Sequence, residues 1–376
     1  MERFDRSGTG SVKWARAGEG RIALGLADMD LPGPPEIGAA LAERAGHSAY
    51  GYTACDPAGR ELVAAWYRER HGVTVDPDWV LLLPFSPRTA LRLLFTAAGP
   101  RRPVAFPAPE WGGFAQICDS AGLPYRAVPL ARDATGYRLP VAALARGGAD
   151  LIALSSPHNP SGRVWTAEEI RYLAQAVADS GGLLVSDEVH GDLVHPDHGL
   201  AQPVAAVVAE GASRHVVTLN SVGKTFNTSG VPSCFALVPD PGLRERLTTL
   251  MAGYGLWEGG LLEQVVQQAA LRHGGPWLDA LLGELVSARD LVLAALPDGA
   301  VLSRPEASYL LWLDSAALGL PADRAREVLL TERGVELSDG ADFGPAGRGF
   351  LRLNYTLPRP LLRTALTRLT GSSCGE

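Results

Sequence analysis

Short apolar runs alternate with helical patterns between about residues 100 and 240. The runs are PVAF at 103–106, LIAL at 151–154, LLVS at 183–186, VVTL at 216–219 and CFALV at 234–238. Between the second and third runs, Thr166 can cap a helix that has acidic residues in its first turn, and Gly181 can end it. Strands that alternate with helices are typical of βαβ units. We therefore expect an α/β domain in which a doubly wound, largely parallel sheet is covered by helices.

The last hundred residues follow a different pattern. A helical stretch near 277–296 precedes the strand-like SYLLWLD at 308–314, a helix around 322–333 and the strand-like GFLRLNYT at 349–356. This order predicts a second, smaller α+β domain. We expect an N-terminal arm with part of the small domain at 1–44, a large domain at 45–265 and the C-terminal small domain at 266–376.

Polar side chains follow three of the predicted strands at the point where each strand ends. Asn159, Asp187 and Lys224 stand in the segments that come after residues 154, 185 and 219. Ligands of open α/β sheets bind outside the carboxyl ends of the strands. Each residue alone has a structural explanation, as a turn residue, a helix cap or an ion-pair partner. Together they predict one polar crevice that holds an amide, a carboxylate and an amine.

The lysine is the most informative of the three residues. The chain has 34 lysines and arginines, but only Lys13 and Lys224 are lysines. An arginine stays charged in a protein, whereas a buried lysine can lose its proton and act as a nucleophile. A lysine, a carboxylate and a hydrogen-bond donor are the groups that a pyridoxal phosphate site requires. An ordinary solvated or ion-paired Lys224 is the alternative explanation.

Such a site also needs a group of donors for the phosphate. Ser221 lies three residues before Lys224, and PFSPRTAL at 84–91 leads from a predicted strand into a predicted helix. The amino end of a helix attracts phosphate, and Arg88 can add a charge-assisted contact. Ser86 and Pro87 belong to the same turn, although Pro87 removes one backbone donor.

Several motifs together resemble a known family. PHNPSG, SDEVHGDL and SVGKTFNTSG resemble the pyridoxal-phosphate enzymes of fold type I in aminotransferase class I/II. RSGTGSVKW, LADMDLPGPPEI, YGYT, RPEASYLLWLD and GFLRLNYTLPR are similar to its branch of cystathionine β-lyases and related carbon–sulfur lyases. The resemblance extends from about residue 6 to 368.

The resemblance implies a role for each candidate residue. Lys224 would hold the cofactor as a Schiff base and act in catalysis, and Asp187 would pair with the ring nitrogen. The remaining cofactor contacts would come from Ser86, Pro87, Arg88, Trp111, Asn159, His190, Ser221 and, across a homodimer interface, Tyr52. The substrate would be bound by Arg352, which takes its α-carboxylate, and by the segment with Gly25 and Ala27. For Trp111 and Arg352, core burial and a surface position are the respective alternatives.

The chain also departs from the lyase pattern. Ser86-Pro87-Arg88 replaces a glycine followed by small apolar residues, and Gly25 stands where the family commonly has a tryptophan. An indole replaced by hydrogen predicts a roomier substrate pocket.

Composition excludes several other classes of protein. The formal charge of −7 and the lack of long basic runs argue against nucleic acid and membrane partners. The amino terminus lacks the apolar core of a signal peptide, so a cytoplasmic protein is expected. Cys55, Cys118, Cys234 and Cys374 show no paired spacing, which indicates free thiols, and no metal site is expected. His195 and His198 lack a third ligand and are expected in a surface loop.

These observations predict a homodimeric pyridoxal-phosphate enzyme that acts on a small amino-acid substrate. We expect a carbon–sulfur β-lyase that converts an S-substituted L-cysteine to a thiol, pyruvate and ammonia. The pocket expected at Gly25 favours a bulky conjugate, such as an S-glycosyl cysteine from antibiotic biosynthesis. The alternatives are an aminotransferase or decarboxylating oxidative deaminase of a cysteine S-conjugate, and a non-catalytic regulatory protein that binds pyridoxal. The negative charge and the lack of a DNA-binding segment argue against the last of these.

Overall fold

A computed structural model describes residues 6, 8–133, 136–199 and 201–371 of the chain. Seven strands form its main sheet, in the order β2-β10-β9-β8-β7-β3-β4. Strand β10 runs antiparallel to both of its neighbours, and the other pairs are parallel. The strands are β2 (Val80–Leu83), β3 (Val104–Ala108), β4 (Tyr125–Pro129), β7 (Leu151–Ser155), β8 (Leu183–Asp187), β9 (Val216–Asn220) and β10 (Cys234–Leu237).

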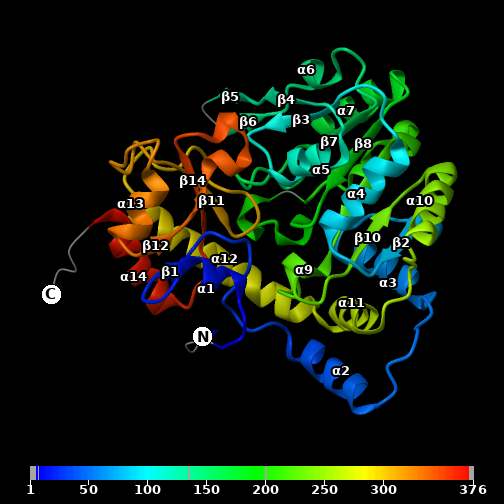
Figure 1. Ribbon diagram of the computed structural model, residues 1–376, viewed down its shortest axis with the longest axis horizontal. Helices are drawn as coiled ribbons and strands as arrows, with labels where there is room; N and C mark the ends of the chain where they lie inside the picture. The colour runs from blue at the N-terminus through cyan, green and yellow to red at the C-terminus, as the bar shows by residue number, and fades with distance from the viewer. Residues whose placement is uncertain (1–5, 7, 134–135, 200, 372–376) are drawn as a thin grey trace.

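Helices cover both faces of this sheet (Figure 1). Alternate residues of a strand enter different hydrophobic clusters: Leu184 packs in one and Val185 in the other. Both faces of β8 are therefore buried, which explains why its sequence is continuously apolar. The helices of this part are α3 (Ala58–Trp66), α4 (Pro87–Ala98), α5 (Gly113–Ala121), α6 (Val141–Ala145), α7 (Ala167–Asp179), α8 (Ala205–Val208), α9 (Val222–Thr225), α10 (Pro241–Gly253) and α11 (Leu261–His273). The expected doubly wound α/β fold is confirmed.

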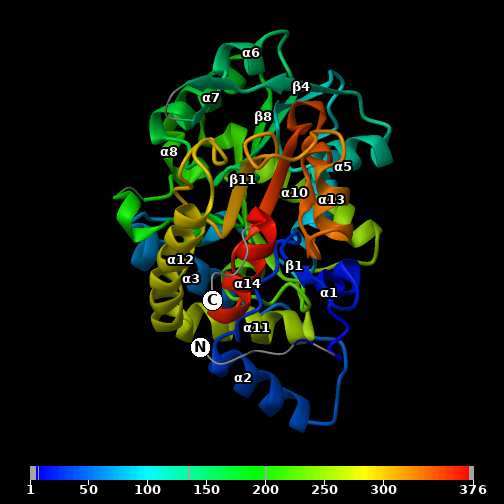
Figure 2. The same ribbon diagram turned by 90° about the vertical axis from the view of Figure 1, so that its left-hand side faces the viewer.

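A second group of elements contains segments from both ends of the chain, which pair with each other. Strand β1 (Ile22–Ala23) pairs with β12 (Val335–Glu336), and β11 (Leu310–Asp314), β14 (Phe350–Asn354) and β13 (Ser338–Asp339) form another sheet. Figures 1 and 2 both show the blue N-terminal elements beside the orange and red C-terminal ones. The remaining elements are α1 (Val12–Ala17), α2 (Pro35–Gly46), the hairpin β5 (Ala131–Asp133) and β6 (Gly136–Arg138), α12 (Gly275–Ala295), α13 (Ala325–Thr331) and α14 (Arg359–Thr370). The domain boundaries at residues 44 and 265 stay predictions.

Local signals in the sequence explain where several elements begin and end. Thr166 caps α7 and forms a capping box with Glu169, and Gly181 follows the helix with a φ of 68°. Helix α13 is shorter than the helix expected over 322–333. No helix in the described part of the chain is long and apolar enough to cross a membrane.

One expectation about the histidines is wrong. His195 is buried, and its ring contacts the backbone oxygens of Pro305 and Ser308 at 3.1 and 2.7 Å. The chain folds back over this loop at residues 305–308, so the HPDH segment is not a simple surface loop. Cys55, Cys118 and Cys234 are free thiols, and Cys374 lies outside the described residues.

Candidate active site

A cavity of about 250 Å³ opens at the carboxyl ends of β7, β8 and β9. It is closed from the other side by β14 and by the segment that follows β1. Most residues that the sequence singled out line it together: Ala27, Ser86, Pro87, Arg88, Trp111, Asn159, Asp187, His190, Ser221, Lys224 and Arg352. Gly25 and Tyr52 do not belong to this lining.

Asp187 is the last residue of β8 and is 6% exposed. Its Oδ1 accepts a hydrogen bond from the backbone of Val189 at 3.3 Å. Burial raises the pKa of this carboxyl to about 7, and the Lys224 charge opposes that rise. The side chain is thus a buried acid that a cationic partner in the cavity would hold ionised.

Lys224 lies in the short helix α9, directly after β9. Its Nζ donates to the backbone oxygen of Ala27 at 2.7 Å, and among the described residues it forms no ion pair with Asp187, whose charge acts on it only from a distance. Burial lowers the pKa of this ammonium to about 8, and the charge of Asp28 opposes the shift. At this pKa about a tenth of the amine is neutral at pH 7, far more than for an ordinary lysine, and the neutral form is the one that a nucleophile or base requires.

Arg352 lies in the middle of β14 and is 6% exposed, so it is not a surface arginine. It donates to Asn159 Oδ1 at 2.9 Å and to the Gly25 oxygen at 3.0 Å, and its guanidinium lies 4.8 Å from the centre of the Phe343 ring. Burial lowers its pKa to about 10, and its buried Nε has no hydrogen-bond partner within the described part of the chain. A planar cation in this position suits a carboxylate.

The turn before α4 and the turn before α9 supply hydroxyl groups and backbone donors at one end of the cavity. Ser86 caps α4 and accepts from the Thr89 backbone at 3.2 Å, while Pro87 takes the first helical position. A residue there has no intrahelical partner for its N–H, so the proline does not break the helix. Ser221 Oγ accepts from the Gly223 backbone at 3.0 Å and donates to the Ser233 oxygen at 2.6 Å.

A buried carboxyl that the sequence analysis missed connects three residues of the lining. Glu110 accepts from the Ser155 hydroxyl at 2.5 Å, from the Ser155 backbone at 3.0 Å and from the Trp111 backbone at 2.7 Å. Ser155 Oγ in turn accepts from the Asn159 backbone at 2.9 Å. Burial raises the pKa of Glu110 to about 8. The only sign of this residue in the sequence was that Glu110 is the single charged residue in the segment PAPEWGGF.

His190 is held as a neutral ring. Its Nδ1 lies 3.0 Å from Ser308 Oγ, its ring meets Tyr309 edge to face, and burial lowers its pKa to about 3. Ser308 has a φ of 71°, a left-handed conformation that few residues other than glycine adopt. The sequence analysis missed both Ser308 and Tyr309, because their contacts join segments more than a hundred residues apart.

The surroundings of Gly25 contradict the expectation of a roomier substrate pocket at this residue. A Cβ on this residue would lie 2.5 Å from Glu336 Oε2 and 2.9 Å from the Ser338 backbone nitrogen. The Glu336 carboxylate accepts from the Gly25 N–H at 3.2 Å and occupies the position beside Gly25 where a side chain would begin. Tyr52 is 97% exposed, and its ring lies against Trp257 at 5.8 Å.

The residues present fit pyridoxal phosphate by their chemistry. Asp187 offers a buried carboxyl for a ring nitrogen, Lys224 an amine for the aldehyde, and Trp111 an aromatic face at the cavity wall. The amino end of α4 lies at the same cavity, through Ser86 and Arg88, and suits the phosphate.

Comparisons with known proteins agree with this chemistry. The family model described as aminotransferase class I and II matches residues 21–369. The chain is 32% identical to the cystathionine beta-lyase PatB of Bacillus subtilis and 27% identical to protein MalY of Escherichia coli, over 98% and 97% of its length and 98% and 96% of theirs. A putative aminotransferase from Clostridium difficile 630 with bound pyridoxal phosphate superposes with a TM-score of 0.92 at 27% identity and 98% coverage of both chains. The crystal structure of OvoB superposes with a TM-score of 0.89 at 30% identity, covering 100% of this chain and 99% of that one.

Proposed function

The chain belongs to the aminotransferase class I and II family of pyridoxal-phosphate enzymes, and from that premise we propose that it is a homodimeric carbon–sulfur β-lyase. Its substrate is an S-substituted L-cysteine, which it converts with water to a thiol, pyruvate and ammonia. The observation that carries the proposal is the convergence of Arg352, Lys224 and Asp187 on one cavity.

Each of the three residues has a defined task. Arg352 binds the α-carboxylate through its planar guanidinium and so fixes Cα beside Lys224. The neutral amine of Lys224 removes the proton from Cα, and the sulfur leaves Cβ as a thiolate. Bound pyridoxal phosphate supplies the electron sink for this reaction. Asp187 would pair with the ring nitrogen of the bound cofactor, and a positive partner there would keep this carboxyl ionised.

Names of relatives support β-elimination over transfer of the amino group. PatB, at 32% identity, is a cystathionine beta-lyase, and a Corynebacterium glutamicum relative at 27% identity has the same name. An LL-diaminopimelate aminotransferase from Desulforudis audaxviator is 30% identical over 93% of the chain, so transamination is the second candidate. Fold alone does not choose between these reactions.

The surroundings of Gly25 support a proposal about the size of the sulfur substituent. A bulky conjugate such as an S-glycosyl cysteine, and with it a place in antibiotic biosynthesis, depended on open space at this residue. Glu336 occupies that space. We therefore expect compact thioethers, such as S-methylcysteine and cystathionine, to react faster than sugar conjugates.

A dimer accounts for an exposed aromatic surface around Tyr52. Tyr50, Tyr52 and Trp257 line one hollow and are 60%, 97% and 47% exposed. Exposed apolar clusters of this kind often mark protein interfaces. In the proposed dimer, Tyr52 reaches the phosphate end of the partner's cavity.

The test of the reaction is the identity of its products. The purified holoenzyme is given cystathionine, S-methylcysteine and an S-glycosyl cysteine, and thiol and keto acid are measured separately. Equal amounts of thiol and pyruvate are expected. A keto acid that still carries the sulfur would show transamination and overturn the proposed lyase.

The lysine is tested by reductive trapping. Borohydride is expected to fix the cofactor on Lys224, because that amine lines the cavity and has a lowered pKa. Peptide mass spectrometry locates the modified residue, and Lys224→Ala is the control that should not be labelled. Label on Lys13 instead would refute the assignment.

A further inference from the structure

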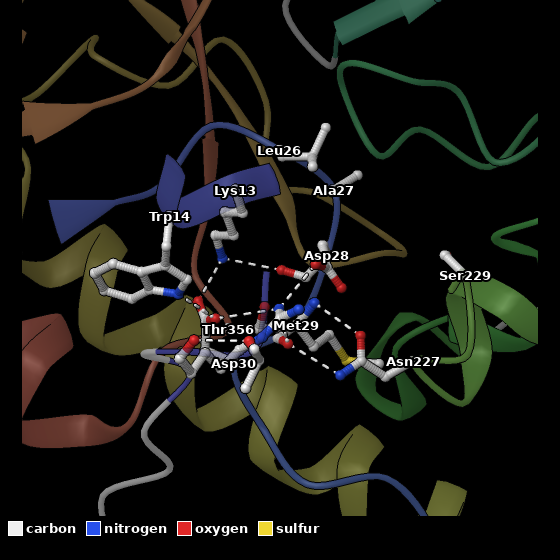
Figure 3. A network of polar contacts seen from close by, with 12 residues as sticks. Lys13, Trp14, Leu26, Ala27, Asp28, Met29, Asp30, Asn227, Ser229 and Thr356 are labelled. Atoms are coloured by element: carbon white, nitrogen blue, oxygen red, sulfur yellow. Dashed lines mark hydrogen bonds and ion pairs between the residues drawn. The ribbon is translucent and has the colours of Figure 1, made fainter. Parts of the chain in front are cut away.

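Residues 26–31, here called the strap, form neither a helix nor a strand, and Leu26 and Ala27 at the start of the strap line the cavity. Side chains from distant parts of the chain hold its backbone oxygens (Figure 3). Asn227 donates to the Met29 oxygen at 2.9 Å, and Lys13 donates to the Asp28 oxygen at 2.9 Å while pairing with Asp30 at 2.6 Å. The strap is therefore an ordered wall of the cavity, fixed by hydrogen bonds in place of regular secondary structure.

Asn354 has a special position beneath the strap. It is fully buried, and its Nδ2 donates to the Leu26 oxygen at 2.7 Å and to the Asp28 oxygen at 2.8 Å. These two carbonyls flank that of Ala27 in sequence. A clamp on both neighbouring peptide groups fixes the direction in which the Ala27 oxygen points.

The Ala27 oxygen accepts two hydrogen bonds. One comes from Lys224 Nζ at 2.7 Å and the other from the hydroxyl of the buried Tyr309 at 3.3 Å. Burial raises the pKa of Tyr309 far above its ordinary value, so its hydroxyl remains a donor at every working pH. The two donors share one acceptor, and each weakens the bond that the other makes.

We propose that the Ala27 carbonyl holds the Lys224 amine in place, and that Asn354 and Tyr309 are positioning residues that set the strength of this hydrogen bond in opposite directions. Asn354 aims the oxygen at the amine, whereas Tyr309 competes with the amine for it. The inference rests on the proposed function in one respect only, that Lys224 is the reactive lysine.

Other charges also act on the Lys224 amine and must stay constant in a test. Burial lowers its pKa most, Asp28 on the strap and Asp187 on β8 raise it, and Arg352 on β14 lowers it. Neither Asn354 nor Tyr309 carries a charge at working pH. Neutral substitutions of these two residues therefore change the hydrogen bond and leave the charges in place.

The chain is well suited to a direct measurement, because it contains only two lysines. The full-length protein, labelled with ¹³C at the lysine Cε and freed of cofactor by hydroxylamine and dialysis, should give two lysine signals. Lys224→Met identifies its own signal by deletion. Titration of the remaining signal then gives the pKa of each lysine in every variant.

The two variants should move the pKa of Lys224 in opposite directions. Asn354→Leu frees the carbonyl to turn away, so the ammonium loses its acceptor and the pKa falls by about one unit. Tyr309→Phe removes the competing donor and raises the pKa. A general loosening of the fold would move both values the same way, and that result, or no shift in Tyr309→Phe, would overturn the inference.

Asn227→Gly is the matched control. It removes three hydrogen bonds from the strap, two at Met29 and one at Leu31, but none at Ala27, and glycine tolerates the φ of 58° that Asn227 adopts. The Lys224 pKa should stay unchanged in this variant. If Asn354→Leu does not fold, as judged by circular dichroism, Tyr309→Phe against Asn227→Gly still decides the question.

A second readout separates this inference from the proposed reaction. In the holoenzyme, Tyr309→Phe should change kcat through proton transfer and leave KM nearly unchanged, because Arg352 holds the substrate independently. If the Lys224 pKa shifts in opposite directions in Asn354→Leu and Tyr309→Phe but the enzyme has no lyase activity, the proposed reaction is refuted and the proposed role of the Ala27 carbonyl is supported. If the enzyme has lyase activity but the Lys224 pKa is unchanged in both variants, the proposed role of the Ala27 carbonyl is refuted and the proposed reaction is supported.

Discussion

Three buried acids lie in and beneath the cavity, and burial raises the pKa of each. Asp187 rises to about 7, and Glu110 and Glu188 rise to about 8. Glu188 faces away from the cavity, where the Ala205 backbone and the Ser186 hydroxyl each donate to it at 2.9 Å. Of these three acids, only Asp187 lines the cavity, so the last residue of β8 is the functional acid and the residue directly after it is a structural one.

Asp187→Asn should therefore lower kcat by orders of magnitude and leave the fold intact. The amide cannot stabilise a positive ring nitrogen, whereas the carboxylate forms a charge-assisted hydrogen bond. Steady-state kinetics and the absorption spectrum of the bound cofactor check this prediction. Near-normal turnover in the variant would mean that the ring nitrogen lies elsewhere.

Glu110 should make stability depend on pH. Its folded pKa of about 8 lies above the ordinary value of 4.5, so the folded chain binds more protons than the unfolded chain between these values. The contribution of Glu110 to the free energy of unfolding is then fully present below pH 4.5, and it is lost as the pH rises through about 8. The melting temperature of wild type minus that of Glu110→Gln should therefore fall from pH 5 to pH 8. Calorimetry on both proteins measures it, and a constant difference would contradict the assigned shift.

Residues differ in how far the sequence alone could identify them. Asp187 and Lys224 follow apolar runs directly, so the rule that parallel strands end at one edge brings them together. Glu110, Tyr309 and Glu336 could not be found this way, because each acts through contacts with distant segments. Gly25 was misjudged for the same reason, since the side chain that fills its space comes from residue 336.

At the scale of elements, regular strands and helices were predictable and the strap was not. The apolar runs and the Thr166 capping signal have a period and a position that sequence reveals. The strap is held by side chains from α1, from the loop after α9 and from β14. No local pattern encodes such an arrangement.

Helix α4 is the element on which cofactor affinity should depend. Arg88 lies in its first turn, lines the cavity and donates to Gln116 from α5. Arg88→Ala should weaken binding of pyridoxal phosphate about tenfold, because one charge-assisted contact to phosphate is lost. The loss should shrink at high salt, since the side chain is exposed. Titration followed by absorbance gives the affinity.

Gln116→Ala is the control for this prediction. It removes the neighbour of Arg88 and leaves the guanidinium itself in place. Affinity equal to wild type is expected. An equal loss in both variants would show that the α4–α5 contact matters and that Arg88 makes no contact with the phosphate.

At the scale of the whole molecule, the proposed dimer makes each site depend on two chains. Lys224→Ala and Tyr52→Ala are each expected to be severely impaired. A mixture that exchanges subunits should regain about a quarter of wild-type activity, because half of the dimers are hybrids with one intact site. Activity assays after mixing, with sedimentation to confirm the dimer, check this outcome. If the subunits exchange but activity does not recover, Tyr52 acts in the site of its own subunit or belongs to neither site.

The placement of the two lysines has a consequence for proteolysis. Lys13 is buried beside Asp30, and Lys224 is reached only through the cavity. A protease that cleaves only after lysine should leave the folded chain intact, since cleavage requires local or global opening. A cut at residue 13 alone would report release of the N-terminal segment, and cuts at both lysines would report unfolding of the sheet. The fragment pattern therefore distinguishes which part of the protein opens first.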